Sequence, residues 1–164
     1  MRDTLEARQG VLGLPLIKNT KHLDPGDSST PEVIQIETAM GAAIEIFEDA
    51  RTLEVGRDRF IPVKTTNDLL VLRSDVYGIG KDFVLDQDGH GIPYVALDPE
   101  FFKFVSDFDK RFPDGAPSLK EATSFTVEGD WTFGHGVTVE GEVSLDRPKT
   151  AQRIAPGTAL GADA

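Results

Sequence analysis

Apolar residues recur every six positions in the last quarter of the chain. One series runs through Val127, Phe133, Val139 and Leu145, and a second runs through Trp131, Val137 and Val143. Ile154 and Leu160 restore the spacing after an insertion around Pro148. A six-residue period is typical of a parallel β-helix, in which each short strand turns a corner and stacks on the previous coil. The alternative is an ordinary β-hairpin that turns at residues 134–136, and the four registered apolar positions favour the β-helix.

The chain before this repeat has the pattern of alternating strands and helices. We expect a helix over 3–8 closed by Gly10, a polar loop over 20–31, a strand over 33–36, and a helix over 39–50 capped by Thr38. We further expect a strand over 60–63, a helix over 68–77 capped by Asn67 or Thr66, and a hairpin or wide loop between 83–85 and 94–97. A last helix over 100–112 opens at Asp98-Pro99 and buries Phe101, Phe104, Val105 and Phe108. The order of these elements predicts an α/β segment.

Composition excludes several kinds of site. The chain has 164 residues and a net charge of −11, which argues against nucleic acid as a partner because such binding needs clustered Lys and Arg. Without cysteine there are no disulfides, thiolate metal sites or cysteine nucleophiles. His22, His90 and His135 stand far apart without metal-ligand spacing, and we expect His90 and His135, which stand among glycines, to be solvated turn residues. No apolar run approaches ~20 residues and the first residues carry no apolar signal region, so we expect no membrane partner and a cytoplasmic location.

Lys64 is the strongest candidate for a binding residue. It follows the apolar run 60–63 and precedes a helix start, so a strand would deliver its ammonium beside free backbone amides. Both features favour an anion such as phosphate, although a lysine in such a place can also be merely solvated. We interpret the acids Glu37 and Asp68 as structural. Glu37 would orient backbone or pair with an arginine such as Arg59, and Asp68 would share the helix cap.

Four segments together resemble one family. Residues 18–24, 33–44, 57–70 and 127–134 are similar, in this order, to segments of the eukaryotic-type UDP-glucose pyrophosphorylases, which are nucleotidyltransferases. Asn67 stands where that family usually has serine. The resemblance implies that residues 1–117 are the C-terminal part of a Rossmann-like nucleotidyltransferase α/β domain. Residues 118–164 would then form a short left-handed parallel β-helix.

The resemblance also implies a reaction. In the family, glucose 1-phosphate attacks UTP to give UDP-glucose and pyrophosphate, with Mg²⁺ neutralising charge, and the residue matching Lys64 contacts phosphate. The family's glycine-rich Leu-x-Gly-Gly-Leu-Gly-Thr loop and its uracil-reading and sugar-reading segments are missing from the chain. We therefore assign no catalytic residue and no metal ligand, and expect little activity from the chain alone. The abrupt helical start leads us to expect a truncation of a longer parent.

Two alternatives stay open. A β-helix has open ends with unpaired backbone groups, so the chain could be a non-enzymatic assembly or regulatory module that forms homo-oligomers through this domain. It could also derive from another pyrophosphorylase that acts on a UDP-sugar or a UDP-N-acetylhexosamine, because the sugar-selecting residues of the family lie outside these 164 residues.

Overall fold

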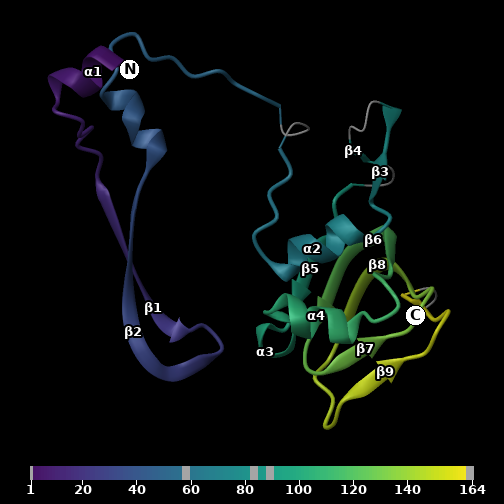
Figure 1. The fold of residues 1–164 in the computed structure, drawn as a ribbon. Helices are drawn as coiled ribbons and strands as arrows, with labels where there is room; N and C mark the ends of the chain where they lie inside the picture. The colour runs from purple at the N-terminus through teal and green to yellow at the C-terminus, as the bar shows by residue number, and fades with distance from the viewer. Residues whose placement is uncertain (1, 57–59, 82–84, 88–90, 162–164) are drawn as a thin grey trace. The chain divides into compact units, whose positions relative to one another are not determined.

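The structure, a computed structural model, describes residues 2–56, 60–81, 85–87 and 91–161. It consists of two compact units, Met1–Gly56 and Arg57–Ala164, each described by itself below (Figure 1). The units divide at 56/57 and not at the expected boundary of 117/118. Residues 94–97 pair with residues 124–127, which joins the two sides of the expected boundary. Within the described residues, no helix has the length and apolar character needed to cross a membrane.

The first unit is a long antiparallel ribbon, with one short helix before its first strand and another after its second, both at the end of the ribbon opposite the turn (Figure 1). Helix α1 (Arg2–Ala7) confirms the expected N-terminal helix, and Gly10, with φ of +82°, follows it. Strands β1 (Leu16–Asp24) and β2 (Asp27–Thr38) pair from Leu16 opposite Thr38 to Asp24 opposite Asp27. The loop predicted over 20–31 is therefore wrong, although the strand predicted over 33–36 is confirmed within β2. Polar side chains stabilise the turn between β1 and β2. Asp24 Oδ1 accepts from the Gly26 amide at 2.8 Å, and Thr30 Oγ1 donates to the Asp27 carbonyl at 2.7 Å.

The helix predicted over 39–50 is also wrong. In its place is a 3₁₀ helix, η1 (Met40–Glu45), whose N-cap is Ala39 and which has no side-chain cap hydrogen bond. Thr38, the expected cap, is instead the last residue of β2. Without a cap or a buried face, the segment lacks the interactions that extend a helix.

None of the described residues up to position 56 is buried. The pairing of β1 with β2 places Leu16, Ile34 and Ile36 on one face of the ribbon, where they are 72%, 57% and 66% exposed. A two-stranded ribbon of this kind is marginally stable by itself. The buried apolar core of the described structure lies in the second unit.

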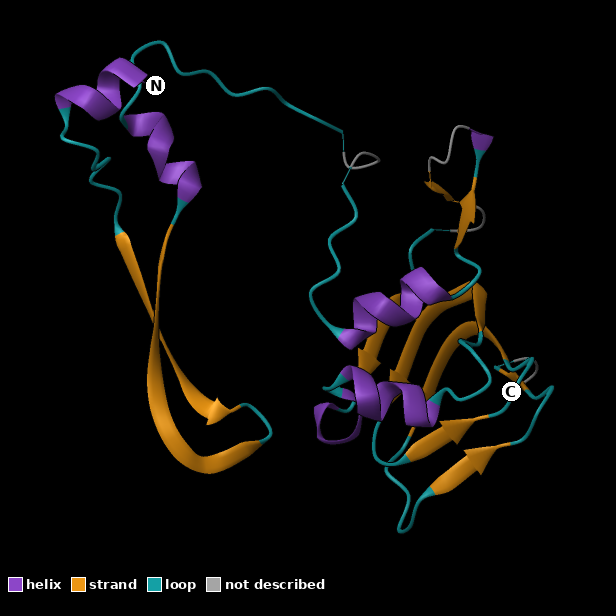
Figure 2. Cartoon of the chain, viewed as in Figure 1, coloured by secondary structure: helices purple, strands orange, loops and turns teal. Residues whose placement is uncertain are grey.

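In its described residues, the second unit combines parallel strands with α-helices (Figure 2). Its helices are α2 (Thr66–Arg73), α3 (Pro99–Phe102) and α4 (Val105–Arg111). Its strands are β3 (Tyr77–Ile79), β4 (Leu85–Gln87), β5 (Tyr94–Leu97), β6 (Ser118–Val127), β7 (Trp131–Phe133), β8 (Thr138–Leu145), β9 (Gln152–Ile154) and β10 (Ala159–Leu160). A parallel sheet has the order β10-β8-β6-β5, β7 pairs in parallel with β9, and β3 pairs antiparallel with β4.

The six-residue apolar series lies inside this unit. Val127, Phe133 and Val139 of the first series are at most 1% exposed, and Val137 and Val143 of the second are also buried. Val127 pairs with Leu145, three six-residue steps later along the chain. The hairpin alternative is wrong, because β7 pairs with β9 and not with the following β8.

The helix predicted over 100–112 is divided into α3 and α4. Asp98 caps α3 as expected, since its Oδ1 accepts from the Glu100 amide at 3.0 Å and Pro99 occupies the first turn. The break between α3 and α4 changes which side chains face the core, so the predicted set of buried residues is only partly right. Phe108 is buried as predicted, but Phe104 and Val105 are exposed, and Phe102 and Phe112 complete the buried face.

Three further predictions around these helices are corrected. Residues 60–63 form no strand, and the helix predicted over 68–77 is the earlier α2. Of the hairpin or wide loop predicted between 83–85 and 94–97, the hairpin is wrong, because β4 pairs with β3 and β5 pairs with β6. Residues 83 and 84 lie outside the described residues. Tyr94 to Leu97 is too far along the chain from β6 for local pattern to reveal this pairing.

Arg111 joins α4 to the turn between β6 and β7. Its Nε donates to Asp130 Oδ1 at 2.9 Å, its Nη1 donates to the Asp107 carbonyl at 3.1 Å, and its guanidinium lies 5.2 Å from the Phe101 ring centroid. The Arg111 side chain is only 14% exposed. The Asp130 side chain is 32% exposed, so loss of the arginine leaves a partly desolvated carboxylate without its cation.

We expect Arg111→Ala to lower the free energy of unfolding by about 2–3 kcal/mol, because it removes a shielded ion pair and an arginine–aromatic contact. Urea unfolding followed by the fluorescence of Trp131, the single tryptophan, measures this. The control is Arg73→Ala. Arg73 pairs with Asp109 at 2.6 Å, but its side chain is 46% exposed, so this substitution should lower the free energy of unfolding by less than about 1 kcal/mol. Equal losses would contradict the role given to burial.

Gly129 and Gly141 occupy equivalent places in the repeat, and both have positive φ, +84° and +64°. A Cβ at Gly129 would lie 2.7 Å from Pro148 Cδ, whereas one at Gly141 meets no atom within 4 Å. We expect Gly141→Ala to cost about 1 kcal/mol for the backbone alone and Gly129→Ala to cost clearly more, because the proline ring cannot yield. Urea unfolding of both variants tests this, and the reverse order would contradict the close approach of the two turns.

Candidate functional site

Lys64 lies in the extended segment that enters α2. Its side chain is exposed, and its backbone N–H donates to Asp68 Oδ2 at 2.9 Å. The strand predicted to end at Lys64 is absent, so the backbone of the residue is positioned by the helix that follows it. Whether the ammonium contacts phosphate stays a prediction at this point.

The cap of α2 is Thr65, not Thr66 or Asn67 as the sequence suggested. Thr65 Oγ1 accepts from the Asp68 amide at 3.5 Å, and Asp68 Oδ2 accepts from the Thr65 amide at 2.9 Å. This reciprocal capping box confirms the structural role expected of Asp68. The Thr-x-x-Asp spacing of residues 65 and 68 was the signal in the sequence that could have located the cap.

The Asp68 carboxylate occupies the end of the helix where an anion was expected. Partial desolvation raises its pKa, but hydrogen bonds from the backbone of Lys64 and Thr65, the Thr65 hydroxyl and the Lys64 charge outweigh it. The pKa of Asp68 therefore lies below its ordinary value. A fixed negative charge at this place opposes a second anion, so of the two features expected to favour phosphate, the Lys64 ammonium is the stronger.

Asn67 has a role that the sequence did not reveal. Its Oδ1 accepts from the backbone N–H of Leu97 at 3.0 Å, which ties the first turn of α2 to the end of β5. Residues thirty positions apart make this bond, so no local pattern announces it. The bond fixes the loop that carries Lys64 relative to the parallel sheet.

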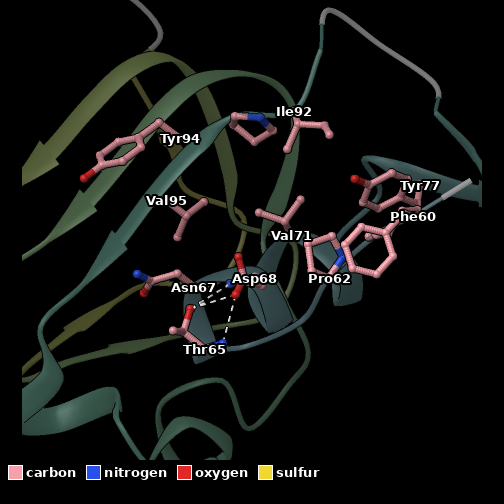
Figure 3. A pocket seen from close by; sticks show the side chains of 12 residues that line it. Phe60, Pro62, Thr65, Asn67, Asp68, Val71, Tyr77, Ile92, Tyr94 and Val95 are labelled. Carbon is pink, nitrogen blue, oxygen red and sulfur yellow. Dashed lines mark hydrogen bonds between the residues drawn. The ribbon is translucent and has the colours of Figure 1, made fainter. Parts of the chain in front are cut away.

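A cavity of about 390 Å³ opens beside this turn (Figure 3). Thr65, Asn67 and Asp68 provide its polar side. The remaining wall is apolar and aromatic, and consists of Phe60, Ile61, Pro62, Val71, Tyr77, Ile92, Pro93, Tyr94 and Val95. In Figure 3 Asp68 lies at the base of the cavity, with Phe60, Pro62 and Tyr77 on one side and Tyr94 and Val95 on the other. The Thr65 hydroxyl donates to the Asp68 carboxylate at 3.0 Å as part of the helix cap, so this site is better suited to binding and orienting a group than to nucleophilic catalysis.

The remaining candidates are not among the residues that line this cavity. Asn19 Nδ2 donates to Glu37 Oε1 across the ribbon, while the expected partner Arg59 lies outside the described residues. Nδ1 of His22 lies 3.0 Å from the Thr30 carbonyl, His135 is exposed in a turn, and His90 lies outside the described residues. Across the part of the chain that the structure describes, no group of three or more His, Asp or Glu side chains could hold a metal ion.

Comparison with known proteins assigns the family. A family model described as UTP–glucose-1-phosphate uridylyltransferase matches residues 1–140. The chain belongs to this family. A UTP–glucose-1-phosphate uridylyltransferase from Musa acuminata is 41% identical over 138 residues, which are 82% of this chain and 28% of that protein. One from Pyrus pyrifolia is 37% identical over 153 residues, which are 92% of this chain and 31% of that protein.

Solved structures agree with this assignment. The UDP-glucose phosphorylase from Trypanosoma brucei matches with a TM-score of 0.88 and 39% identity over 97% of this chain and 35% of its own. A mutant of the Leishmania major UDP-glucose pyrophosphorylase, solved in complex with UDP-glucose, matches with a TM-score of 0.83 and 42% identity over 97% of this chain and 34% of its own. This uridylyltransferase-family chain thus spans about a third of the length of the relatives it matches.

We expect Asp68→Asn to destabilise the chain by about 1 kcal/mol at neutral pH, because the charged partner of the capping box is lost. The folded-state pKa is lowered, so the contribution is present above the ordinary value of 3.8 and disappears as the pH falls through the lowered pKa. The difference between the stabilities of the two proteins should therefore begin to shrink only below about pH 4. Urea unfolding between pH 7 and pH 3 measures this difference, and a gap independent of pH would contradict the assignment.

Proposed function

We propose that this chain forms the C-terminal third of a UTP–glucose-1-phosphate uridylyltransferase, which converts UTP and glucose 1-phosphate to UDP-glucose and pyrophosphate. The observation that carries the proposal is the family match over residues 1–140, with relatives of that name at about 40% identity. The complex of the Leishmania major enzyme with UDP-glucose supports the same substrate class. Because the chain spans about a third of these relatives, we propose that it is inactive in isolation.

Lys64 would contact phosphate in this reaction. Phosphoryl chemistry depends on positioning and on neutralising the charge of the transferring group, which an exposed ammonium on an anchored backbone can do. The Asp68 hydrogen bond holds the Lys64 backbone, and Asn67 holds the same turn against β5. Lys64 would stabilise charge and would not act as a base.

The family implies Mg²⁺, which would neutralise phosphate charge when bound. The described residues offer no cluster of acidic or histidine side chains to hold such an ion, so we assign no ligand for it in this chain. Every role that we propose here belongs to the Lys64 ammonium and its supports.

We further propose that residues 118–164 form a short left-handed parallel β-helix that follows the C-terminal part of the nucleotidyltransferase domain, residues 1–117. The parallel pairing of β6, β8 and β10, and of β7 with β9, supports the stacking of coils. The pairing of Val127 with Leu145 three six-residue steps apart supports three short sides for each coil.

A second function has some support from the same strands. In the described structure β9 pairs with β7 alone and β10 with β8 alone, so each leaves one edge for another copy of the chain. A homo-oligomeric assembly or regulatory module could use these edges. A uridylyltransferase that prefers another UDP-sugar is a third proposal, and activity assays with different sugar 1-phosphates distinguish it from the first.

We expect the purified chain to release no pyrophosphate from UTP and glucose 1-phosphate. A chimera in which the chain replaces the matched segment of the Hordeum vulgare relative, 40% identical over 138 residues, should be active. In that chimera Lys64→Met should lower kcat/KM at least about 100-fold, because a phosphate loses its cation. A coupled pyrophosphate assay measures both.

The control is Lys110→Met, since Lys110 is a largely exposed lysine that pairs with Asp107 on α4. It should change kcat/KM less than about twofold. A folded chimera without activity would contradict the proposed function. Full activity of the Lys64→Met chimera would contradict the phosphate contact alone, and turnover by the isolated chain that depends on Lys64 would contradict its inactivity.

A further inference from the structure

Three arginines in the second unit share one arrangement, in which a guanidinium contacts both an aromatic ring and an aspartate. Arg73 pairs with Asp109 at 2.6 Å and lies 5.4 Å from the Phe108 centroid. Arg111 pairs with Asp130 at 2.9 Å and lies 5.2 Å from the Phe101 centroid. Arg147 pairs with Asp98 and lies 5.5 Å from the same ring. Carboxylate and ring together suit a planar, weakly hydrated cation.

The cavity beside α2 presents the same two partners. Asp68 lies at its base, and Phe60 and Tyr77 line one wall (Figure 3). The three donors to the Asp68 carboxylate all approach Oδ2: the Lys64 amide, the Thr65 amide and the Thr65 hydroxyl. No ion pair within the described part of the chain involves Asp68. Oδ1 therefore keeps lone pairs with which to accept from a bound donor.

We propose that this cavity is a binding socket for an arginine side chain presented by a partner polypeptide. The methylene stem would lie along Pro62 and Ile92, the guanidinium would stack near Phe60 and Tyr77, and its N–H groups would donate to Asp68 Oδ1. The volume of about 390 Å³ accommodates such a side chain with the backbone that carries it.

The electrostatics favour a cation over an apolar or anionic group. Hydrogen bonds and the neighbouring Lys64 keep the pKa of Asp68 low, despite its partial desolvation, so the base of the cavity is negative at neutral pH. The net charge of −11 attracts a basic partner over a longer range. Arginine suits the aromatic wall better than lysine does, because its planar guanidinium stacks on rings and sheds water more easily.

Titration of the full isotope-labelled chain with N-acetyl-L-arginine methylamide, followed by NMR, tests the proposal. We expect saturable shifts at Thr65, Asn67, Asp68, Tyr77 and Ile92 with a dissociation constant in the millimolar range, of about 1–10 mM. The citrulline analogue has the same shape without the charge and should bind at least about fivefold more weakly. Shifts that do not saturate, or that spread over the acidic surface, would overturn the proposal, as would equal binding of the two probes.

Variants separate the two partners of the guanidinium. Asp68→Asn should weaken arginine binding at least about fivefold, and Tyr77→Leu, which leaves the capping box untouched, should weaken it about threefold. The control is Asp109→Asn, which removes the same charge from a carboxylate outside the cavity and should bind as the unaltered chain does. Equal weakening by Asp109→Asn would show an effect of net charge and would overturn the socket.

Arginine binding by this cavity is independent of nucleotidyl transfer, and a substitution at Lys64 separates the two proposed roles. Lys64→Gln removes a cation next to Asp68, so arginine binding should be unchanged or tighter by up to about twofold. The proposed reaction needs that same cation. Loss of arginine binding in Lys64→Gln, with the fold intact by circular dichroism, would show that the probe occupies a different site and would overturn the socket.

Discussion

The stack of Phe112 on Phe133 is the contact on which the second unit depends most. The two rings lie 4.9 Å apart with only 12° between their planes. Phe102 and Phe108 pack against Phe112 from the helical side, and Phe125 meets Phe133 edge-on from β6. All five rings are buried, so one continuous aromatic cluster joins α3 and α4 to the parallel strands. The strands of the six-residue repeat therefore share a single core with α3 and α4.

The candidate site is attached to this core by polar bonds at both ends of α2. At its start, Asn67 accepts from the Leu97 amide in the parallel sheet. After its end, Asp75 accepts from the Ser118 hydroxyl at 2.6 Å and from the Leu119 amide at 2.9 Å, at the beginning of β6. The helix thus presents the loop of Lys64 from a fixed position. The same bonds shape the cavity, because its base and one wall come from the first turns of α2.

Local pattern predicted some of these elements and missed others for identifiable reasons. The six-residue series and the Asp98-Pro99 helix start were predictable, because each depends on residues close together in the chain. The ribbon end near Thr30 was missed because Ser, Thr and Asp are typical of loops, yet here Thr30 Oγ1 accepts from the Asp24 amide across β1 and β2. The break after Phe102 was missed because the apolar spacing of 101–108 resembles one continuous stripe.

The amino-acid sequence by itself determined the apolar period of the C-terminal strands, the presence of a helix shortly after Lys64 and the family, because these follow from residue order and spacing. Only the tertiary structure decided that Asn67 bonds to Leu97 and that Asp68 and Tyr77 line one cavity. Such partners are chosen by packing between distant segments. A carboxylate that local pattern assigns to a helix end thereby also lies at the base of a cavity.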